Sequence, residues 1–416
     1  MRARRLRVCL DARIPDGTHG GVQQVILGLA RGLASLPEGP EEYLFLVEPG
    51  QWEWLRPYLV GPCRPLEAPR RPPSILERAR QAIRPGAADS DGTVERAGAD
   101  VVHLTLQDGF RTRLPSIYMP YDLQHVHLPE FFGEAERESR ERVYRDLCHQ
   151  ASVVVAISRW GAQDLIRTYR MPPAKVRTVH LAPAVEAYAP RSDRELGELR
   201  ARLRLPESFA LYPARFWPHK NHRNLLEALA ALRSEGGPVV PLVLTGSGGK
   251  GDPDVRRQVA GLGLADQVTI LGFVAPHEIQ AAFQGSRLLV FPSLFEGFGM
   301  PVLEAFRLGV PVAASRVTCL PEIAGGAAHL FDPQDPRDLA RAVGEAWTDP
   351  VLRERLVERG RARASAFTWG RTATAFRALY RTLAGRAVDE ADRAALAETS
   401  EAGGDPVLRS DRDAPG

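Results

Sequence analysis

The segment Phe291–Glu304, FPSLFEGFGMPVLE, restricts the possible fold more than any other part of this 416-residue chain. It starts at the end of an apolar strand, continues through a loop with two glycines, and enters a helix in which Pro301 suits the first turn. This order is the building unit of an α/β fold, whose ligands bind at the carboxyl ends of the strands. Glycines let a ligand approach the backbone, and a helix N-terminus attracts phosphate. Glu296 precedes the helix and Glu304 lies within it, so their carboxylates can hold hydroxyl groups on either side of such a phosphate.

The same order of strand, loop and helix recurs along the chain. The first strand is followed by a loop with Gly20 and Gly21, after which apolar residues return at helical spacing. The loop lacks GxGxxG spacing, so a glycine-rich turn without a ligand remains an alternative. The predicted strands are Leu6–Leu10, Tyr43–Val47, Asp100–Leu106, Ser116–Met119, Ser152–Ile157, Val176–Val179, Phe209–Pro213, Val239–Thr245, Val268–Leu271, Leu288–Phe291 and Val310–Ala313. We therefore expect an α/β protein with two doubly wound, Rossmann-like parallel sheets.

Changes in composition suggest where the domains begin and end. The polar stretch Ala182–Gly197 has no clear periodicity and is interpreted as the linker. We expect an N-terminal domain over residues 1–187 and a second domain over residues 188–366. Residues 387–416 contain eight acidic and three basic residues and few large apolar ones, which predicts a disordered acidic tail.

Composition also excludes several classes of protein. A net charge of +3 is too small to indicate nucleic-acid binding. The four cysteines have no CxxC spacing, which argues against a metal site or disulfide framework and fits a reducing cytoplasm. No apolar run approaches the roughly 20 residues that span a bilayer, and the basic N-terminus runs into a short strand rather than a signal sequence. We therefore expect a cytoplasmic protein.

A basic segment interrupts the first half. Residues 64–84 contain six arginines and two glutamates and are interpreted as a solvated insertion. Within them, SILERARQAI has the alternative of a basic amphipathic helix that contacts the inner face of a membrane or an anionic acceptor.

Two cations accompany the first strand of the second half. Arg215 and Lys220 flank the turn between that strand and the next helix, at the sheet edge that Glu296 also occupies. Paired cations at a helix start can bind a diphosphate and stabilise it as a leaving group. Together with two hydroxyl-binding carboxylates, this pattern indicates a nucleotide sugar, in which sugar, diphosphate and ribose follow one another.

With these features the chain resembles the retaining glycosyltransferases of GT-B architecture and family 4. The matching pieces are the Gly20–Gly21 loop, the Arg215…Lys220 pair, GFV at Gly272–Val274, FPSLFEGFGMPVLEAFRLGVPV, and LPEIAGGAA at Leu320–Ala328. The resemblance spans Arg5–Arg386 and implies two Rossmann-like domains that face a central cleft. It also implies that a helix at residues 367–386 crosses back to the N-terminal domain.

The resemblance assigns roles to these residues one by one. Arg215 and Lys220 would bind the diphosphate, and Glu304 would hold the ribose hydroxyls. Glu296 would hold hydroxyls of the donor sugar and would not act as the nucleophile. The backbone of the EGFGM loop would assist it, and the first-domain glycines would approach the donor phosphates; these residues are Gly297, Phe298, Gly299, Met300, Gly20 and Gly21.

The first-domain loop PYDLQHVHLPEFF departs from the family pattern. Family members commonly have a His-Asp pair here, whereas this chain has Tyr121 followed by Asp122. Either Tyr121 replaces the histidine, or His125 or His127 serves the sugar or the acceptor, since histidine handles protons near neutral pH. A structural role for both histidines is the alternative.

The resemblance implies an enzyme that moves a sugar from a nucleoside diphosphate to a glycan or a lipid-linked acceptor. The distribution of the family favours mannose from GDP-mannose, although nothing in the sequence identifies the base. No cofactor or metal is expected, because the cations and the helix dipole neutralise the departing diphosphate. The alternatives are a nucleotide-sugar epimerase of GT-B architecture and a non-catalytic relative that binds the donor.

Overall fold

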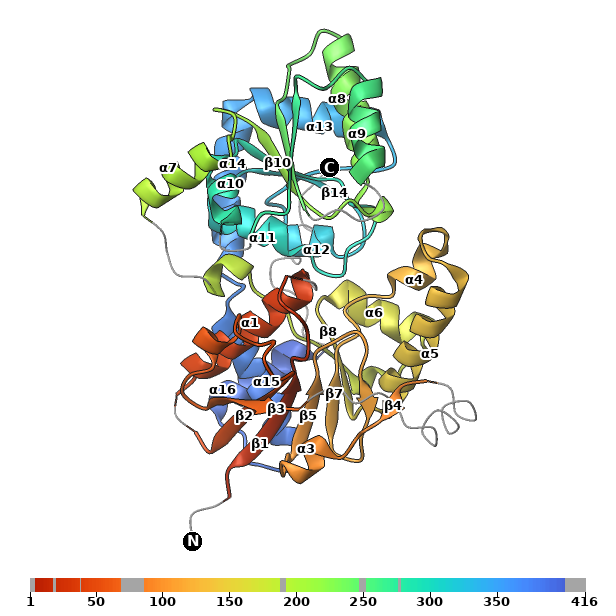
Figure 1. Ribbon diagram of the computed structural model, residues 1–416, viewed down its shortest axis with the longest axis vertical. Coiled ribbons are helices and arrows are strands. Elements are labelled where there is room, and N and C mark those ends of the chain that lie inside the picture. Colours follow the sequence, from red (N-terminus) through yellow and green to blue (C-terminus); the bar gives the residue numbers. More distant parts are fainter. Residues whose placement is uncertain are drawn as a thin grey trace, which may run out of the picture. The chain divides into compact units, whose positions relative to one another are not determined.

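The computed structural model divides the chain into two compact units (Figure 1). It describes residues 4–17, 20–37, 39–68, 86–187, 192–246, 252–275 and 278–400. The first unit combines Met1–Ala182 with Thr368–Gly416, and the second is Pro183–Phe367. The chain therefore leaves the first unit, builds the second, and returns.

The first unit is built on a seven-stranded sheet in the order β3-β2-β1-β5-β7-β8-β9, with every neighbouring pair parallel. Its strands are β1 (Leu6–Asp11), β2 (Glu41–Val47), β3 (Cys63–Glu67), β5 (Val101–Leu104), β7 (Ser116–Tyr118), β8 (Val153–Ala156) and β9 (Val176–Thr178). A separate parallel pair is formed by β4 (Ala88–Asp89) and β6 (Phe110–Arg111). The helices are α1 (Gly21–Ser35), α3 (Thr93–Arg96), α4 (Gln124–His127), α5 (Glu134–Gln150), α6 (Arg159–Thr168), α15 (Trp369–Leu383) and α16 (Glu390–Thr399), with short 3₁₀ turns η1 (Arg56–Tyr58), η2 (Pro129–Phe131) and η3 (Pro173–Lys175).

The second unit has a six-stranded sheet in the order β12-β11-β10-β13-β14-β15, again parallel throughout. Its strands are β10 (Ala210–Pro213), β11 (Leu242–Thr245), β12 (Val268–Gly272), β13 (Leu288–Phe291), β14 (Val312–Ser315) and β15 (His329–Phe331). Its helices are α7 (Asp193–Arg202), α8 (His222–Ser234), α9 (Asp252–Gly261), α10 (Ile279–Gly285), α11 (Met300–Arg307), α12 (Leu320–Ala324), α13 (Pro336–Thr348) and α14 (Pro350–Ala364), with 3₁₀ turns η4 (Ala184–Ala187) and η5 (Pro218–Lys220). These two sheets confirm the prediction of two doubly wound α/β domains.

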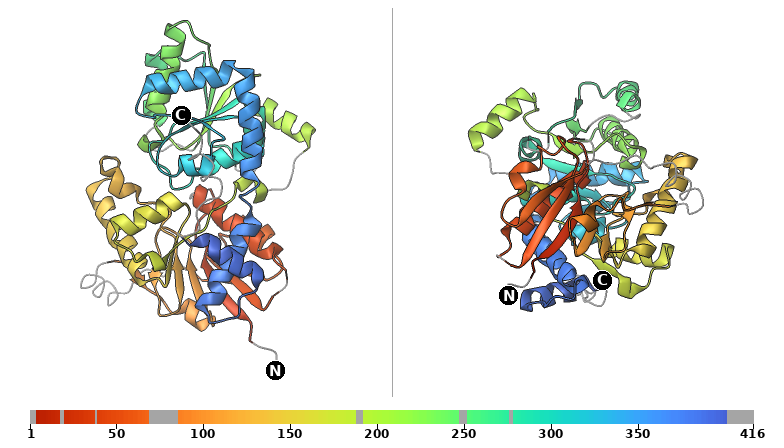
Figure 2. Two further views of the ribbon diagram at one scale, coloured as in Figure 1. Left: turned by 180° about the vertical axis from the view of Figure 1, so that it is seen from behind. Right: turned by 60° about the horizontal axis from the view of Figure 1, so that its bottom comes forward.

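Close packing of two helices attaches the end of the chain to the first unit. Helices α1 and α15 pack against each other, and Figure 2 lets the reader follow α15 and α16 along the first unit. A Cβ at Gly28 would lie 2.0 Å from Cε2 of Trp369, and a Cβ at Gly32 would lie 2.4 Å from the Trp369 carbonyl oxygen. Both positions therefore need glycine, because no side chain fits between the helices.

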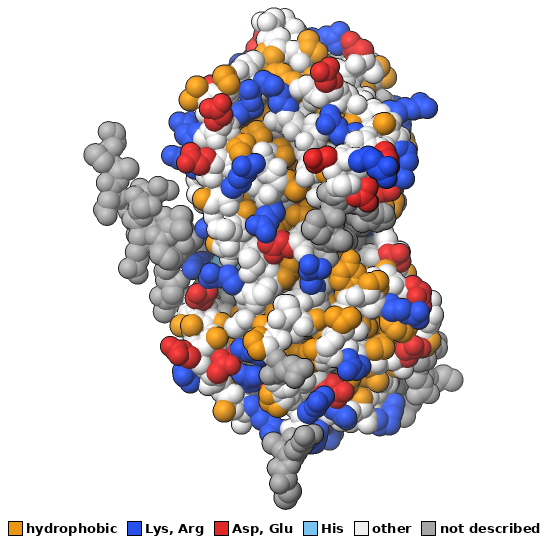
Figure 3. Space-filling view, turned by 90° about the vertical axis from the view of Figure 1, so that its left-hand side faces the viewer, with side chains coloured by type: hydrophobic (Ala, Val, Ile, Leu, Met, Phe, Trp, Pro, Cys, Tyr) orange, Lys and Arg blue, Asp and Glu red, His pale blue; other side chains and the backbone are white. Residues whose placement is uncertain are grey.

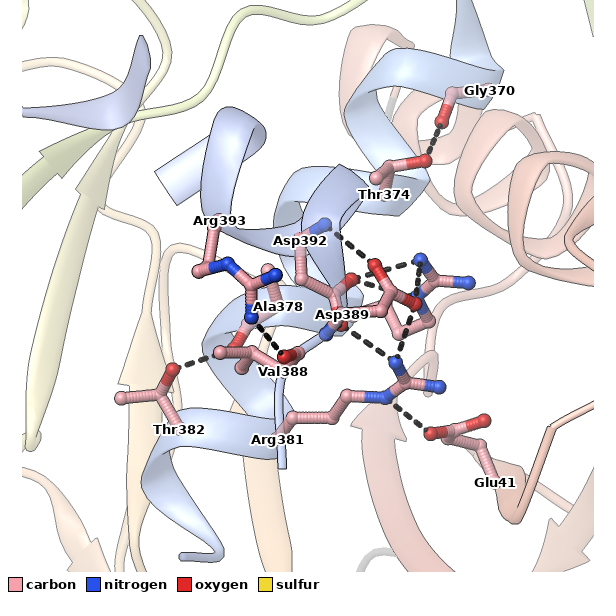
Figure 4. A network of polar contacts seen from close by, with 11 residues as sticks. Glu41, Gly370, Thr374, Ala378, Arg381, Thr382, Val388, Asp389, Asp392 and Arg393 are labelled. Carbon is pink, nitrogen blue, oxygen red and sulfur yellow. Dashed lines mark hydrogen bonds and ion pairs between the residues drawn. The ribbon is translucent and has the colours of Figure 1, made fainter. Parts of the chain in front are cut away.

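Helix α16 contradicts the prediction of a disordered acidic tail over its residues, Glu390–Thr399. Asp392 is fully buried and forms ion pairs with Arg377 at 2.8 Å and Arg381 at 2.6 Å. Arg381 also pairs with Glu41 of β2 at 2.7 Å (Figure 4). The acidic composition was misleading because arginines of α15 neutralise these carboxylates in the fold. The remainder of the predicted tail lies outside the described residues.

The structure also corrects the predicted linker and the predicted set of strands. The linker is shorter than Ala182–Gly197, because Ser192 begins α7: its hydroxyl accepts a hydrogen bond from the Glu195 N–H and the Glu195 carboxylate accepts one from the Ser192 N–H. Strands β3 and β15 were missed. Both lie at sheet edges and are short, and β3 contains a proline, so neither shows a clear periodicity. The basic stretch SILERARQAI lies outside the described residues.

Charged side chains of both signs are interspersed on the face drawn in Figure 3. Within the described ranges, no helix combines the length and apolar character that crossing a bilayer requires.

Candidate functional site

The candidate site lies at the point in the second sheet where the strand order reverses. From β10 the chain proceeds through β11 to β12 at one edge, whereas β13, β14 and β15 extend to the other edge. Strands β10 and β13 are parallel neighbours, so the loops after them leave the same edge of the sheet. Open α/β sheets bind ligands outside the carboxyl ends of the strands at such a reversal. Arg215 and Lys220 follow β10, and Glu296 follows β13.

An ion pair joins these two loops. Nζ of Lys220 lies 2.6 Å from Oε1 of Glu296, and the two side chains are only 18% and 12% exposed. The backbone on each side is held: the Tyr212 hydroxyl donates to the Lys220 carbonyl at 2.7 Å, and the Glu296 N–H donates to the Thr318 hydroxyl at 3.2 Å. The Cys319 thiol also donates to the Glu296 carbonyl at 3.2 Å. Both charges are therefore fixed where a ligand at the sheet edge would meet them.

Asn221 fixes the turn that carries Lys220. It adopts a left-handed conformation with φ of 60°, which asparagine tolerates better than most residues. Its buried Nδ2 donates to the carbonyls of Pro292 at 3.0 Å and Pro333 at 2.8 Å, so one side chain connects the loops after β10, β13 and β15. A further backbone bond runs from the Leu294 N–H to the His219 carbonyl at 2.8 Å.

The start of α11 needs a glycine. Gly299 occupies the N-cap with φ of 87°, and a Cβ there would lie 2.6 Å from Cδ2 of Leu320. Met300 is the first helical residue, and Pro301 occupies the first turn, as expected from the sequence. The chain therefore enters this helix through a backbone conformation that only glycine adopts readily. The first N–H groups of the helix lie beside Glu296.

Glu304 lies in α11 and is 8% exposed. Among the described residues its carboxyl has no hydrogen bond and no ion pair. Burial raises its pKa to about 7, because removal from water disfavours the charged carboxylate. A buried carboxyl without a partner is costly unless a ligand satisfies it, so Glu304 is a candidate for contact with ligand hydroxyls.

Arg215 and Phe298 are placed differently from each other. The guanidinium of Arg215 lies over the ring of Trp217 with 5.2 Å between Cζ and the ring centroid, and Trp217 is 44% exposed. Phe298 is buried and packs against the ring of Phe367, with 6.1 Å between centroids. Its side chain therefore belongs to the core, and a role in ligand binding would fall to its backbone, like that of Gly297.

The predicted glycines of the first unit lie at an equivalent reversal. The first sheet reverses between β1 and β5, and the loop after β1 contains Gly20 and Gly21. Gly20 is the N-cap of α1 with φ of 46° and ψ of −115°, and Gly21 begins the helix. This loop lies at the carboxyl edge of its own sheet, and its backbone conformation at Gly20 is one that requires glycine.

The two predicted site histidines, His125 and His127, have separate carboxylate partners. His125 is 1% exposed, with Nε2 at 3.0 Å from Oε2 of Glu141, and burial lowers its pKa. His127 places Nε2 at 2.8 Å from Oδ1 of Asp164. Oδ1 of Asp122 accepts a hydrogen bond from the Gln124 N–H at 3.1 Å, which begins α4. The part in catalysis predicted for Asp122, His125 and His127 stays a prediction. The contact of the buried His125 with Glu141 favours the alternative that this histidine has a structural role.

Tyr121 has a structural partner too. It lies in the left-handed region with φ of 68°, and its hydroxyl donates to the Thr105 carbonyl at 2.6 Å. Burial raises the pKa of this phenol, so it stays neutral. Tyr121 thereby connects the loop after β7 to the loop after β5.

The sequence analysis missed a buried ion pair at the same edge. Arg13 donates from Nε to Oδ1 and from Nη2 to Oδ2 of Asp11, both at 2.9 Å, and Thr105 donates to the Asp11 carbonyl. Asp11 ends β1. The available signal was an acid and an arginine two residues apart at the end of a buried strand.

Comparison with known proteins decides the family. Residues 198–363 match the family described as "Glycosyl transferases group 1", and residues 19–182 match "Glycosyltransferase Family 4". The O-antigen chain mannosyltransferase B of Escherichia coli is 31% identical over 267 residues, which cover 61% of this chain and 70% of that protein. The chain belongs to glycosyltransferase family 4. Its candidate site, from Arg215 to Glu304, lies within the group 1 match.

This glycosyltransferase is also similar to a second mannosyltransferase in sequence and to a solved structure in fold. The serotype-specific mannosyltransferase WbdA of Escherichia coli is 32% identical over 230 residues, which cover 54% of this chain but only 28% of that longer protein. The crystal structure of Anabaena Alr3699/HepE in complex with UDP and glucose has a TM-score of 0.69 at 20% identity, and covers 91% of this chain and all of that one. This likeness confirms the fold that the resemblance implied.

The glycosyltransferase shows no metal-binding cluster in the part of the chain that the structure describes: no three or more His, Cys, Asp or Glu side chains lie together as ligands there. The expectation of metal-free transfer stays a prediction.

Proposed function

We propose that this glycosyltransferase is a retaining enzyme that moves mannose from GDP-mannose to a growing glycan or a lipid-linked glycan. The observation that carries the donor site is the Lys220–Glu296 pair beside the start of α11, with Glu304 inside that helix, whose carboxyl has no partner in the described part of the chain. A cation from the loop after β10 thus meets two acids and a helix N-terminus from the connection after β13, which suits the successive parts of a nucleotide sugar.

The diphosphate would lie against Lys220, Arg215 and the N-terminus of α11. As the bond from the sugar to the diphosphate breaks, negative charge grows on the phosphate oxygens, and fixed cations and N–H groups stabilise it. Loss of one such contact typically raises the barrier by about 2.7–4 kcal/mol. We propose that these groups suffice and that no metal is required.

The two glutamates would hold the two ends of the donor. Glu304 is buried and has no partner among the residues that the structure describes, which supports its accepting hydrogen bonds from the ribose hydroxyls. Glu296 would accept from hydroxyls of the sugar. Since Glu296 is paired with Lys220, we propose it as a positioning carboxylate, and the acceptor would attack from the face that the diphosphate leaves.

The choice of mannose rests on the relatives. The O-antigen chain mannosyltransferase B and WbdA are both named as mannosyltransferases, which supports mannose and a glycan acceptor. Since GDP-mannose is an α-linked donor, a retaining enzyme would form an α-linked product.

Two measurements test the proposal. Thermal shifts against GDP-, UDP- and ADP-sugars identify the donor, because a ligand at 100 times its Kd stabilises by about 2.7 kcal/mol. NMR of the product formed with a mannan oligosaccharide then gives the anomeric configuration. GDP-mannose should give the largest shift and an α-linkage, with or without EDTA. A β-linkage would exclude retention, loss of the rate in EDTA would exclude metal-free transfer, and a new nucleotide sugar formed without acceptor would indicate an epimerase.

A further inference from the structure

A second cluster of cations lies at the opposite edge of the second unit's sheet. Arg287 immediately precedes β13 and Pro311 immediately precedes β14, so both lie at the amino ends of their strands. Together with one face of α14 they line a cavity of about 570 Å³. The cavity is lined by Arg287, Pro311, Pro350, Arg353, Glu354, Val357, Glu358 and Arg361. The donor site uses the carboxyl ends of the strands, so the two sites are distinct.

Helical spacing brings the residues of α14 to this cavity. Arg353, Val357 and Arg361 follow at intervals of four and therefore lie on one face of the helix. Glu354 and Glu358 form a second row with the same spacing. The helix thus presents two arginines, separated by Val357, beside two carboxylates.

The three arginines have no carboxylate partner. Among the described residues, none of Arg287, Arg353 and Arg361 forms an ion pair, although Glu354 and Glu358 line the same cavity. Elsewhere in this unit arginines commonly do pair; for example, Arg341 contacts both Asp338 and Glu345. Within the described residues the guanidinium groups of this cavity therefore lack a direct ion pair, although the charges of Asp349 and Glu354 act on Arg353.

Two of these guanidinium groups share one acceptor. Arg287 donates from Nε to the Trp347 carbonyl at 3.2 Å, and Arg353 donates from Nη1 to the same oxygen at 2.7 Å. Burial, and then the nearby charge of Arg287, lowers the pKa of Arg353, and the charges of Asp349 and Glu354 oppose this only in part. Like charges held this close repel each other, and an anion between them would remove that cost.

We propose that this cavity binds a phosphate monoester carried on a hydroxylated group, such as a sugar phosphate. Guanidinium groups bind phosphate through paired N–H donors, and three of them suit one phosphate. A cavity of about 570 Å³ falls in the size range of small-molecule sites and holds more than a phosphate ion. The carboxylates of Glu354 and Glu358 would accept hydrogen bonds from the hydroxyls of the carrier. The same chemistry occurs in a free sugar phosphate and in a phosphoinositide headgroup.

Titration calorimetry with glucose 6-phosphate and with inorganic phosphate tests the site on the full chain. Relative to wild type, the triple variant R287Q/R353Q/R361Q should lose about tenfold or more in affinity for both probes, since charge-assisted hydrogen bonds are lost. E354Q/E358Q should weaken glucose 6-phosphate severalfold but not inorganic phosphate. The matched control is R355Q, an exposed arginine of the same helix that does not line the cavity.

A second arm distinguishes the source of the phosphate. Co-sedimentation with phosphatidylcholine vesicles, with and without phosphatidylinositol 4-phosphate, is compared between wild type and the triple variant. Loss of binding in the variant to either the soluble sugar phosphate or the vesicles supports the cavity and names the source. K220A should retain this binding, because Lys220 belongs to the donor site.

Three results would overturn the proposal: no binding in either arm, equal binding by wild type and the triple variant, or binding lost in K220A but kept in the triple variant. GDP binding reports separately on the donor site, so failure here leaves the proposed transferase function untouched.

Discussion

The buried carboxyl of Glu304 should make the folding stability of the protein depend on pH. Its pKa of about 7, against 4.5 in the unfolded chain, means that the folded state disfavours the charged form. Stability should therefore fall as pH rises from about 4.5 through 7, by up to ~3 kcal/mol. E304Q should raise Tm at pH 8 more than at pH 5, whereas E235Q, at an exposed position, should change Tm equally at both. An equal Tm difference for E304Q at both pH values would contradict the raised pKa.

The ion pair between Lys220 and Glu296 predicts opposite effects for its two partners. K220A removes a phosphate contact and should weaken GDP binding by about tenfold to a hundredfold, since hydrogen bonds to charged groups contribute ~1.5–3 kcal/mol. E296Q removes the competitor that holds Nζ at 2.6 Å, so GDP should bind as tightly as in wild type or severalfold tighter. Turnover of GDP-mannose by E296Q should nevertheless fall, because the sugar contact is lost. Calorimetry with GDP and a steady-state assay separate the two effects; weaker GDP binding by E296Q would sink this assignment.

At the scale of elements, helix α16 depends on one buried charge. Asp392 is fully buried between Arg377 and Arg381, so D392A leaves two buried cations short of a partner. Breaking such a pair typically costs about 3–5 kcal/mol. The first unit should unfold at lower denaturant concentration, and the backbone amides of α16 should exchange faster. E398A on the same helix breaks an exposed pair with Arg371 and should cost less than about 1 kcal/mol. Similar losses for both variants would mean that the network of Figure 4 does not hold the helix.

Two helical glycines predict opposite signs of stability change. G28A places a methyl group against the ring of Trp369 and should lower Tm, because α1 and α15 cannot separate without losing their contact. Gly197 in α7 has open space around its Cβ position, and G197A should raise stability by about 1 kcal/mol through helix propensity. Thermal unfolding of the two variants beside wild type checks both; a G28A protein as stable as wild type would contradict the close packing.

The elements also show where sequence reasoning succeeds and where it ends. Short β-branched runs such as Ser152–Ile157 predict buried parallel strands because no polar residue competes with burial, and β8 confirms this. In the site, glycines and a proline predict the turn into α11, and the loop order predicts that Lys220 and Glu296 share an edge. The Lys220–Glu296 pair joins residues 76 positions apart, and the ion pairs between α15 and α16 join residues 8 to 27 positions apart. Both kinds of contact form only when the chain folds, so local sequence patterns do not encode them.

At the scale of the whole molecule, the division of the chain predicts which fragments fold alone. Pro183–Phe367 is one continuous unit with its own sheet and should fold and bind GDP by itself, since Arg215, Lys220 and both glutamates of the candidate donor site lie in it. Residues 1–182 lack α15, whose Trp369, Phe376 and Tyr380 are buried in the first unit.

Burial of each such aromatic contributes roughly 1.5–3 kcal/mol, which together rivals the roughly 5–15 kcal/mol that stabilises a domain. Without α15 the first unit also loses the hydrogen bond between Nδ1 of His103 and the Tyr380 hydroxyl at 2.7 Å. Residues 1–182 alone should therefore lack a cooperative thermal transition. Joining residues 1–182 to residues 368–400 through a flexible linker should restore it. A cooperative transition for residues 1–182 alone would show that the returning helix only covers the first unit, and failure of the joined fragment would show that the first unit needs the second in order to fold.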